Sequence, residues 1–144
     1  MAYNLQPITL TASASLTRKA HARAVVNASA AAGMTLTLPA SSGDGTTFTV
    51  RVKTTVTSNN LIVQVANATD VMTGYALLAQ DGADTAVMFE TASTSDTITM
   101  NGTTKGGIVG DLIELIDADS GFWQVRVIGS ATGTEATPFS AAVS

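Results

Sequence analysis

The chain contains no cysteine among its 144 residues. Disulfide bonds, thiolate metal sites and cysteine nucleophiles are therefore excluded, and cysteine usage does not indicate a redox compartment. Aromatic residues are also scarce, at 5% of the sequence with a single tryptophan. A glycan-binding site usually needs aromatic platforms, so this scarcity argues against sugar recognition.

Charged residues make up only 12% of the sequence, about half the usual share in globular proteins. The net charge is -4 and the isoelectric point is 4.6. A protein that binds nucleic acid needs a basic face, so we expect no nucleic-acid partner. A surface with little charge keeps neighbouring molecules apart poorly, which favours a protein whose surface is covered by partners.

Long hydrophobic runs are missing too. No apolar segment approaches the ~20 residues that cross a bilayer, so we expect no membrane partner. The N-terminus has no basic residue ahead of an apolar stretch, because the first basic cluster begins at Arg18. This is not the pattern of a signal peptide. We expect the protein to stay in the compartment where it is made, unless it leaves as part of a larger assembly.

The clearest pattern in the sequence lies between residues 96 and 129. It contains three strand-like runs at residues 97–100, 108–116 and 122–128, separated by clusters of Gly, Asn and Asp. Such residues either adopt positive φ cheaply or bond their own backbone, so they reverse the chain. Trp123, in the last run, is expected to anchor a hydrophobic core.

The rest of the chain repeats this pattern more weakly. Six further runs are predicted as strands: residues 8–11, 34–38, 46–53, 61–65, 71–78 and 85–91. In the third of these, Phe48, Val50 and Val52 share one face, which we expect to point into a core. About nine or ten short strands separated by turns predict one all-β domain over residues 1–144, a sandwich or a barrel. We expect an extended arm at residues 1–7 and an irregular tail at residues 130–144.

Residues 17–33 allow two interpretations. Thr17 could cap a helix that runs through the alanine-rich segment to Gly33. Alternatively, residues 17–22 form one helical turn and residues 23–28 form a strand. We prefer the second interpretation, because two adjacent valines favour a pleated surface.

His21 is the only histidine, so a Ser-His-Asp triad would have to use it. It lies among Arg18, Lys19 and Arg23, whose charges oppose its protonation, and no carboxylate is near in sequence. We interpret it as a half-exposed residue in a basic turn. The basic cluster itself is a candidate contact for an acidic partner surface.

Other candidate sites have simpler interpretations. Residues 117–121 carry acidic residues at alternate positions, as a calcium-binding loop does. They lack the third ligand and the closing glutamate of such a loop, so we predict a hairpin turn. In residues 105–107, Lys-Gly-Gly, the lysine precedes the glycines, whereas in a phosphate-binding loop it follows them, so we predict a glycine-rich turn. Asp111 and Glu114 are three apart on a predicted strand, so they cannot converge as glycosidase acids, and we interpret them as solvated charges. We predict no catalytic residue, cofactor or metal.

The sequence contains two blocks of short motifs. The first block holds residues 16–26 (LTRKAHARAVV), 32–40 (AGMTLTLPA) and 43–45 (GDG). The second holds residues 96–102 (DTITMNG), 105–107 (KGG), 110–111 (GD), 121–125 (GFWQV) and 131–134 (ATGT). In their order and spacing they resemble the small β-rich virion proteins of tailed bacteriophages, especially head decoration (cement) proteins.

The resemblance implies a jelly-roll β-sandwich that forms a homotrimer where major capsid protein subunits meet, with no enzymatic activity. It implies a place on the capsid surface of the virion, after synthesis in the cytoplasm of a bacterial host. The alanine-rich residues 27–32 and the long tail depart from the pattern. We expect the arm, the basic cluster and the tail to contact the capsid or other subunits. The candidate contact residues are Tyr3, Leu5, Arg18, Lys19, Arg23, Pro138 and Phe139.

Two other functions compete with this one. Related blocks occur in phage fibre and appendage proteins, so the chain could be a module that recognises a host glycan or receptor. Trp123 is expected to be buried, which leaves few aromatic side chains for a sugar. A hydrolase is the third alternative, and no constellation of residues supports it.

Overall fold

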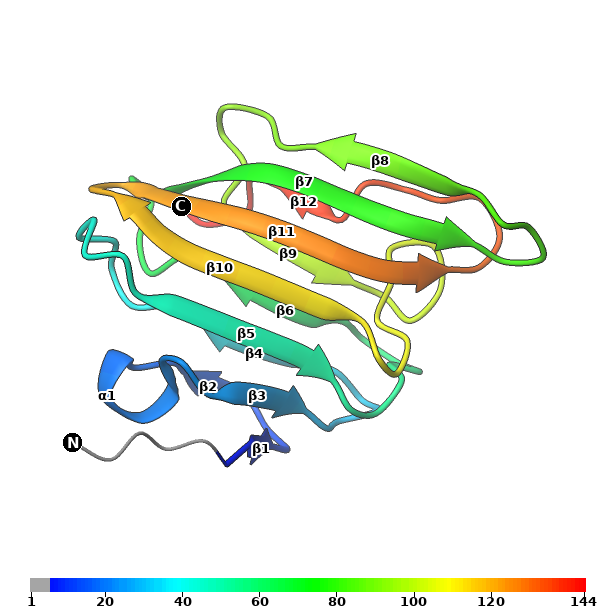
Figure 1. The fold of residues 1–144 in the computed structure, drawn as a ribbon, viewed down its shortest axis with the longest axis horizontal. Helices are drawn as coiled ribbons and strands as arrows, with labels where there is room; N and C mark the ends of the chain where they lie inside the picture. The colour runs from blue at the N-terminus through cyan, green and yellow to red at the C-terminus, as the bar shows by residue number, and fades with distance from the viewer. Residues whose placement is uncertain (1–5) are drawn as a thin grey trace.

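The computed structural model describes residues 6–144. These residues form twelve strands and one short helix, arranged in two stacked layers (Figure 1). The strands are β1 (Ile8–Leu10), β2 (Ala14–Ser15), β3 (Val25–Ala28), β4 (Met34–Thr37), β5 (Thr47–Val52), β6 (Leu61–Gln64), β7 (Val71–Gln80), β8 (Ala86–Glu90), β9 (Thr97–Met100), β10 (Leu112–Asp119), β11 (Phe122–Ala131) and β12 (Phe139–Ser140). The predicted all-β, sandwich-like body is therefore confirmed, with more strands than the nine or ten expected.

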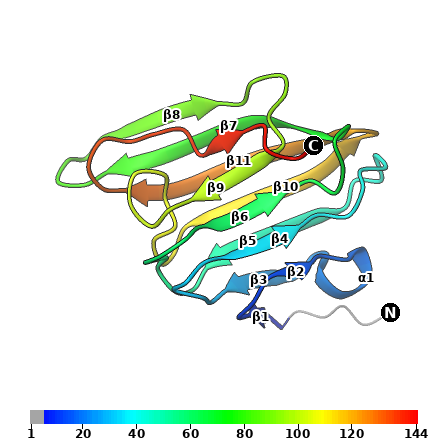
Figure 2. The same cartoon turned by 180° about the vertical axis from the view of Figure 1, so that it is seen from behind.

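The larger sheet, sheet A, has seven strands in the order β1-β3-β5-β10-β11-β7-β8. The smaller sheet, sheet B, has five in the order β12-β9-β6-β4-β2 and lies behind it, as the rear view shows (Figure 2). From β1 to β6 the chain alternates between the sheets, and each new strand lies parallel to the previous one in its sheet. From β7 onward, antiparallel hairpins join β7 to β8 and β10 to β11.

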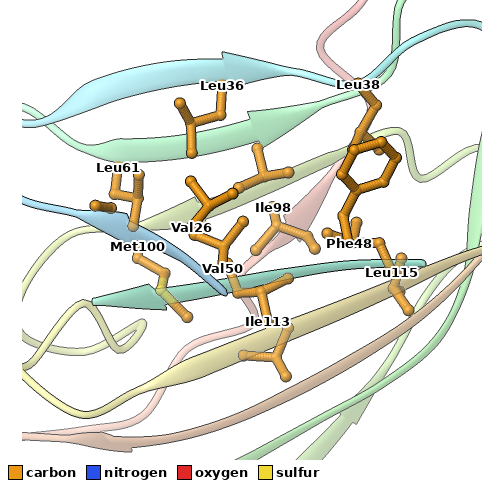
Figure 3. Packing of buried hydrophobic residues seen from close by; sticks show 14 of the residues in the cluster. Val26, Leu36, Leu38, Phe48, Val50, Leu61, Ile98, Met100, Ile113 and Leu115 are labelled. Atoms are coloured by element: carbon orange, nitrogen blue, oxygen red, sulfur yellow. The ribbon is translucent and has the colours of Figure 1, made fainter. Parts of the chain in front are cut away.

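The core lies between the two sheets and is made by alternate residues of each strand. Figure 3 shows Leu36 and Ile98 of sheet B facing Val50 and Ile113 of sheet A. Phe48, Val50 and Val52 are all buried, which confirms the inward face predicted for this strand.

Trp123 anchors the core as expected from its size. Its side chain is fully buried, and its ring centroid lies 5.9 Å from that of Phe48 in a tilted arrangement. Aromatic pairs at this separation add stabilisation beyond their buried area. The indole Nε1 has no hydrogen-bond partner among the described residues, so the tryptophan is held there by packing.

The preferred interpretation of residues 17–33 is confirmed. A single helical turn, α1 (Arg18–His21), is followed by strand β3. The Thr17 hydroxyl caps the turn by accepting a hydrogen bond from the Ala20 N–H at 3.2 Å. Arg23 then has a φ of +63°, a left-handed conformation that reverses the chain between the helix and the strand.

Two predicted strand boundaries were wrong. The strand expected at residues 108–116 begins only at Leu112, and Gly110, two residues before it, is in a left-handed conformation. The same strand continues to Asp119, so the turn predicted at residues 117–121 is confined to its last two residues. β7 extends the strand predicted at residues 71–78 to ten residues and passes through Gly74 without interruption.

The tail predicted to be irregular at residues 130–144 contains ordered pairing. β11 continues to Ala131, and β12 pairs antiparallel with β9. The buried Phe139 side chain belongs to the core, and the Asp96 carboxylate accepts a hydrogen bond from the Ala142 N–H at 2.8 Å. Core packing and this carboxylate fasten the tail to sheet B.

Candidate interaction surface

Large apolar side chains crowd the outer face of sheet A over β7, β8, β10 and β11. We call this the apolar face. Its exposed members are Tyr75, Leu77, Met88, Ile116, Phe122 and Ile128. Over these strands the face is hollowed into a groove of about 410 Å³. Single exposed apolar residues are ordinary on protein surfaces, but a contiguous group of them marks an interaction site.

The register of the strands builds this face in rows. Ile128 of β11 lies beside Leu77 of β7 on one side and Leu112 of β10 on the other. Leu77 in turn lies beside Met88 of β8. Side chains paired across neighbouring strands on one face contact one another. The four residues therefore form one apolar row across four strands.

The neighbouring row carries the charges of the face. Arg126 lies between Glu114 and Tyr75, and its Nη2 donates to the Glu114 carboxylate at 2.5 Å. Glu90 lies beyond Tyr75 at the edge. Because Arg126 and Glu114 neutralise each other, the centre of the face presents little net charge. Its chemistry suits the burial of apolar side chains from a partner.

A buried carboxylate holds the loop beside the basic turn. The fully buried Asp117 accepts hydrogen bonds from the Ser42 N–H at 2.9 Å, the Gly43 N–H at 2.8 Å and the Ser41 hydroxyl at 2.7 Å. Arg18 completes the shell as an ion pair. Burial opposes ionisation of Asp117, but these donors together outweigh it and lower the pKa of the carboxyl.

Arg18 is thereby committed to internal contacts. Its Nε also pairs with Asp44 at 2.7 Å, and hydrogen bonds from Thr46, with a smaller contribution from Arg18, lower the pKa of Asp44 to about 2. Lys19 and Arg23 of the same cluster are exposed. The nearby His21 accepts a hydrogen bond at Nδ1 from the Thr17 N–H at 2.9 Å and is half-buried, as the interpretation of a basic turn expects.

The candidate contact residues are not brought together. The basic cluster lies on α1, between β2 and β3, whereas Pro138 and Phe139 are buried beside β9 at the other edge of sheet B. Because Phe139 is a core residue, its side chain is not accessible to a partner in this structure. Tyr3 and Leu5 lie outside the described residues, and their proposed contacts stay a prediction.

Asp111 and Glu114 do not converge, as expected, but Asp111 is not a solvated charge. It is buried and accepts hydrogen bonds from the Gly107, Ile108 and Ser130 N–H groups at 2.9, 3.1 and 3.1 Å. Burial is the largest influence and raises the pKa of this carboxyl despite these donors. The residue fastens the glycine turn to the end of β11, which explains why β10 begins after it.

Two sequence patterns indicate these features. Outward positions of β7 carry Tyr75 and Leu77 although its inward positions are already apolar, and β11 carries Ile128 at an outward position. Asp117 follows Ile113 and Leu115 at a spacing of two, which places an acid on the inward face of β10. A charged residue in phase with core residues indicates a buried, hydrogen-bonded carboxylate.

Within residues 6–144, no three or more His, Asp or Glu side chains are grouped so that they could hold a metal ion. No helix in this part of the chain is long and apolar enough to cross a membrane.

Comparisons of the chain with protein-family models, curated proteins and solved structures found no match.

Proposed function

We propose that this chain is a structural virion protein that decorates a bacteriophage capsid and stabilises it by binding where major capsid protein subunits meet. The observation that carries the proposal is the apolar face, where a continuous row of four apolar side chains and a groove lie open on a weakly charged protein. Such a surface gains stability by being covered. The identity of the covering partner rests on the sequence resemblance to phage decoration proteins.

Capsid decoration needs modest contacts that symmetry repeats many times. In an assembly of several copies, each contact is multiplied, so no single contact has to be strong. The homotrimer and the jelly-roll type of sandwich belong to the same proposal. The parallel neighbours among β1 to β6 are a feature that an all-antiparallel jelly roll does not have.

Electron microscopy of the source particle tests the function directly. Copies distributed over the head at junctions between capsid subunits are the expected result. Copies confined to a spike, a fibre or the tail would contradict decoration and support the alternative, a module for recognition of a host receptor or glycan. A clear hit on a glycan array would support the same alternative.

Deleting residues 1–7 tests the predicted role of the arm. The described sandwich begins with β1 at Ile8, so removal of the preceding residues leaves every described strand intact. We expect lower occupancy on purified shells and a sandwich that stays folded. Unchanged occupancy would contradict a capsid contact through Tyr3 and Leu5.

A further inference from the structure

β8 is the least protected edge of the two sheets. Among the described strands, the other edges are β1 with three residues and β2 and β12 with two each, whereas β8 has five. Natural proteins protect long edges with lysine, proline or a bulge, because an open edge pairs readily with another chain. The sequence of β8, Ala-Val-Met-Phe-Glu, contains neither lysine nor proline, and its pairing with β7 has no bulge.

The hydrogen bonds at the two ends of β8 show which backbone groups are free. The Gln80 N–H donates to the Thr85 carbonyl at 3.0 Å, and the Thr91 N–H donates to the Gly74 carbonyl at 3.1 Å. Bonded and non-bonded pairs alternate along an antiparallel ladder. Counting inward from both ends, the backbone groups of residues 87 and 89 point to β7. Those of residues 86, 88 and 90 point to the open edge.

The free groups define one self-complementary register. In this register Met88 pairs with Met88 of a second copy, and Ala86 pairs with Glu90, around a two-fold axis at Met88. All six free N–H and C=O groups on each strand then lie opposite a partner. Glu90 faces an alanine instead of another glutamate, so like charges are not opposed. No backbone hydrogen bond to another segment occupies this edge in residues 6–144.

The side chains match in the same register. Val87 and Phe89 point inward and are only partly buried. Each valine would lie against the phenylalanine of the other copy as a non-hydrogen-bonded pair, in which side chains are closest. Aromatic and β-branched residues are favourable partners across strands. On the outer side, Met88 is 63% exposed, the most exposed large hydrophobic residue in the described chain.

We propose that β8 pairs antiparallel with β8 of a second copy of this chain, with Met88 on the two-fold axis. Two sheets of seven strands then form one sheet of fourteen, with both apolar faces on the same side. The apolar row of Leu112, Ile128, Leu77 and Met88 continues into its counterpart. This contact goes beyond capsid decoration, and a trimer contact elsewhere on the molecule is compatible with it.

Cysteine trapping tests the register, because the chain has no cysteine of its own. In a hydrogen-bonded pair the two Cα atoms are about 5.5 Å apart, which suits a disulfide bond. Met88→Cys should therefore form a covalent dimer under mild oxidation. Ile128→Cys is the matched control, since Ile128 is 47% exposed on the same face. It would lie about five strand spacings, or ~24 Å, from its counterpart. We expect at least tenfold faster cross-linking of Met88→Cys, and equal rates would overturn the proposal.

Proline at the same position tests the pairing without a cross-link. Because the Met88 N–H points away from β7, Met88→Pro removes no bond from the monomer and suits an edge strand. Met88→Val is the control that keeps the N–H. Sedimentation across a concentration series should show association of the wild type and of Met88→Val, with at least a tenfold larger dissociation constant for Met88→Pro. Circular dichroism checks that each variant is folded. Equal association of folded Pro and Val variants, or a wild type that stays at 14.6 kDa throughout, would overturn the proposal.

Discussion

The two halves of sheet A present opposite surfaces on their outer side. Over β3 and β5, the outward residues are mostly polar, namely Asn27, Thr47, Thr49 and Arg51, with Val25 as the exception. Over β7, β8, β10 and β11 they form the apolar face. Both halves carry apolar residues on their inner side, where they contribute to the core. Folding therefore does not explain the apolar face, which supports our proposal that a partner covers it.

The halves also differ in how the chain connects their strands. From β1 to β6 the chain crosses between sheets at every step and builds parallel neighbours, whereas β7 to β8 and β10 to β11 are hairpins within sheet A (Figure 1). The first arrangement ends at the three-residue edge strand β1. The second leaves the five-residue edge β8 beside the apolar face. The hairpin half thus carries both surfaces that we propose for assembly.

Adjacent residues on opposite faces of β11 should give the largest contrast in stability. Trp123→Ala removes a fully buried side chain and should lower the free energy of unfolding by about 3–5 kcal/mol. Phe122→Ala removes a half-exposed side chain and should cost about 1 kcal/mol or less. Urea denaturation monitored by circular dichroism measures both. Equal losses would mean that the outward side of β11 is as important to folding as its core side.

Asp117 should give the next largest effect. Asp117→Ala leaves the Arg18 guanidinium without one of its two carboxylates and several loop donors without an acceptor, and should cost about 3 kcal/mol. Because the folded state lowers the pKa of Asp117, its stabilisation is present above the ordinary value of 3.8 and is lost as the pH falls below it. The folded state raises the pKa of Asp111, so ionisation of this carboxyl as the pH rises lowers the free energy of unfolding.

Urea denaturation at several pH values separates these two carboxylates. The difference in unfolding free energy between the wild type and Asp117→Asn should be largest near neutral pH and shrink below about pH 3.8. The Asp111 contribution is common to both proteins and cancels. A difference that is independent of pH would contradict the assigned ion pair.

The smallest effect on stability should come from the outer side of sheet A itself. Ile128→Asp and Thr49→Asp place the same charge on the two halves of the sheet. Each should cost about 1 kcal/mol through lower strand propensity. Thr49→Asp should cost slightly more than Ile128→Asp, because it lies opposite Glu114 of β10 and opposes like charges. Urea denaturation checks this. A much larger loss for Ile128→Asp would show that the apolar face supports folding, which would weaken its assignment as a docking surface.

Local patterns predicted those parts of the fold that depend on nearby residues. The alternation around Phe48, and Thr17 followed by two adjacent valines, sufficed for β5, α1 and β3. The start of β10 was missed because Asp111 is held by Ser130 from a distant part of the chain. The order of the strands in each sheet depends on such long-range contacts. The alternation of apolar and polar residues along a strand does not predict that order.

The candidate surface was harder to predict than the fold. A strand with apolar residues on both faces, such as β7 with Leu77 and Leu78, shows that both sides avoid water but does not show which side meets the core. Phe139 is the only aromatic residue in a polar tail, a pattern that predicts a contact residue, but its side chain packs in the core. The proposed contacts through Tyr3 and Leu5 stay predictions.

Occupancy on purified capsid shells compares the two halves of sheet A most directly. Shells that lack this protein are mixed with the wild type, Ile128→Asp or Thr49→Asp, and bound copies are counted after sedimentation. We expect Thr49→Asp to bind like the wild type and Ile128→Asp to lose at least tenfold in affinity. Equal binding by the two variants would contradict docking through the apolar face.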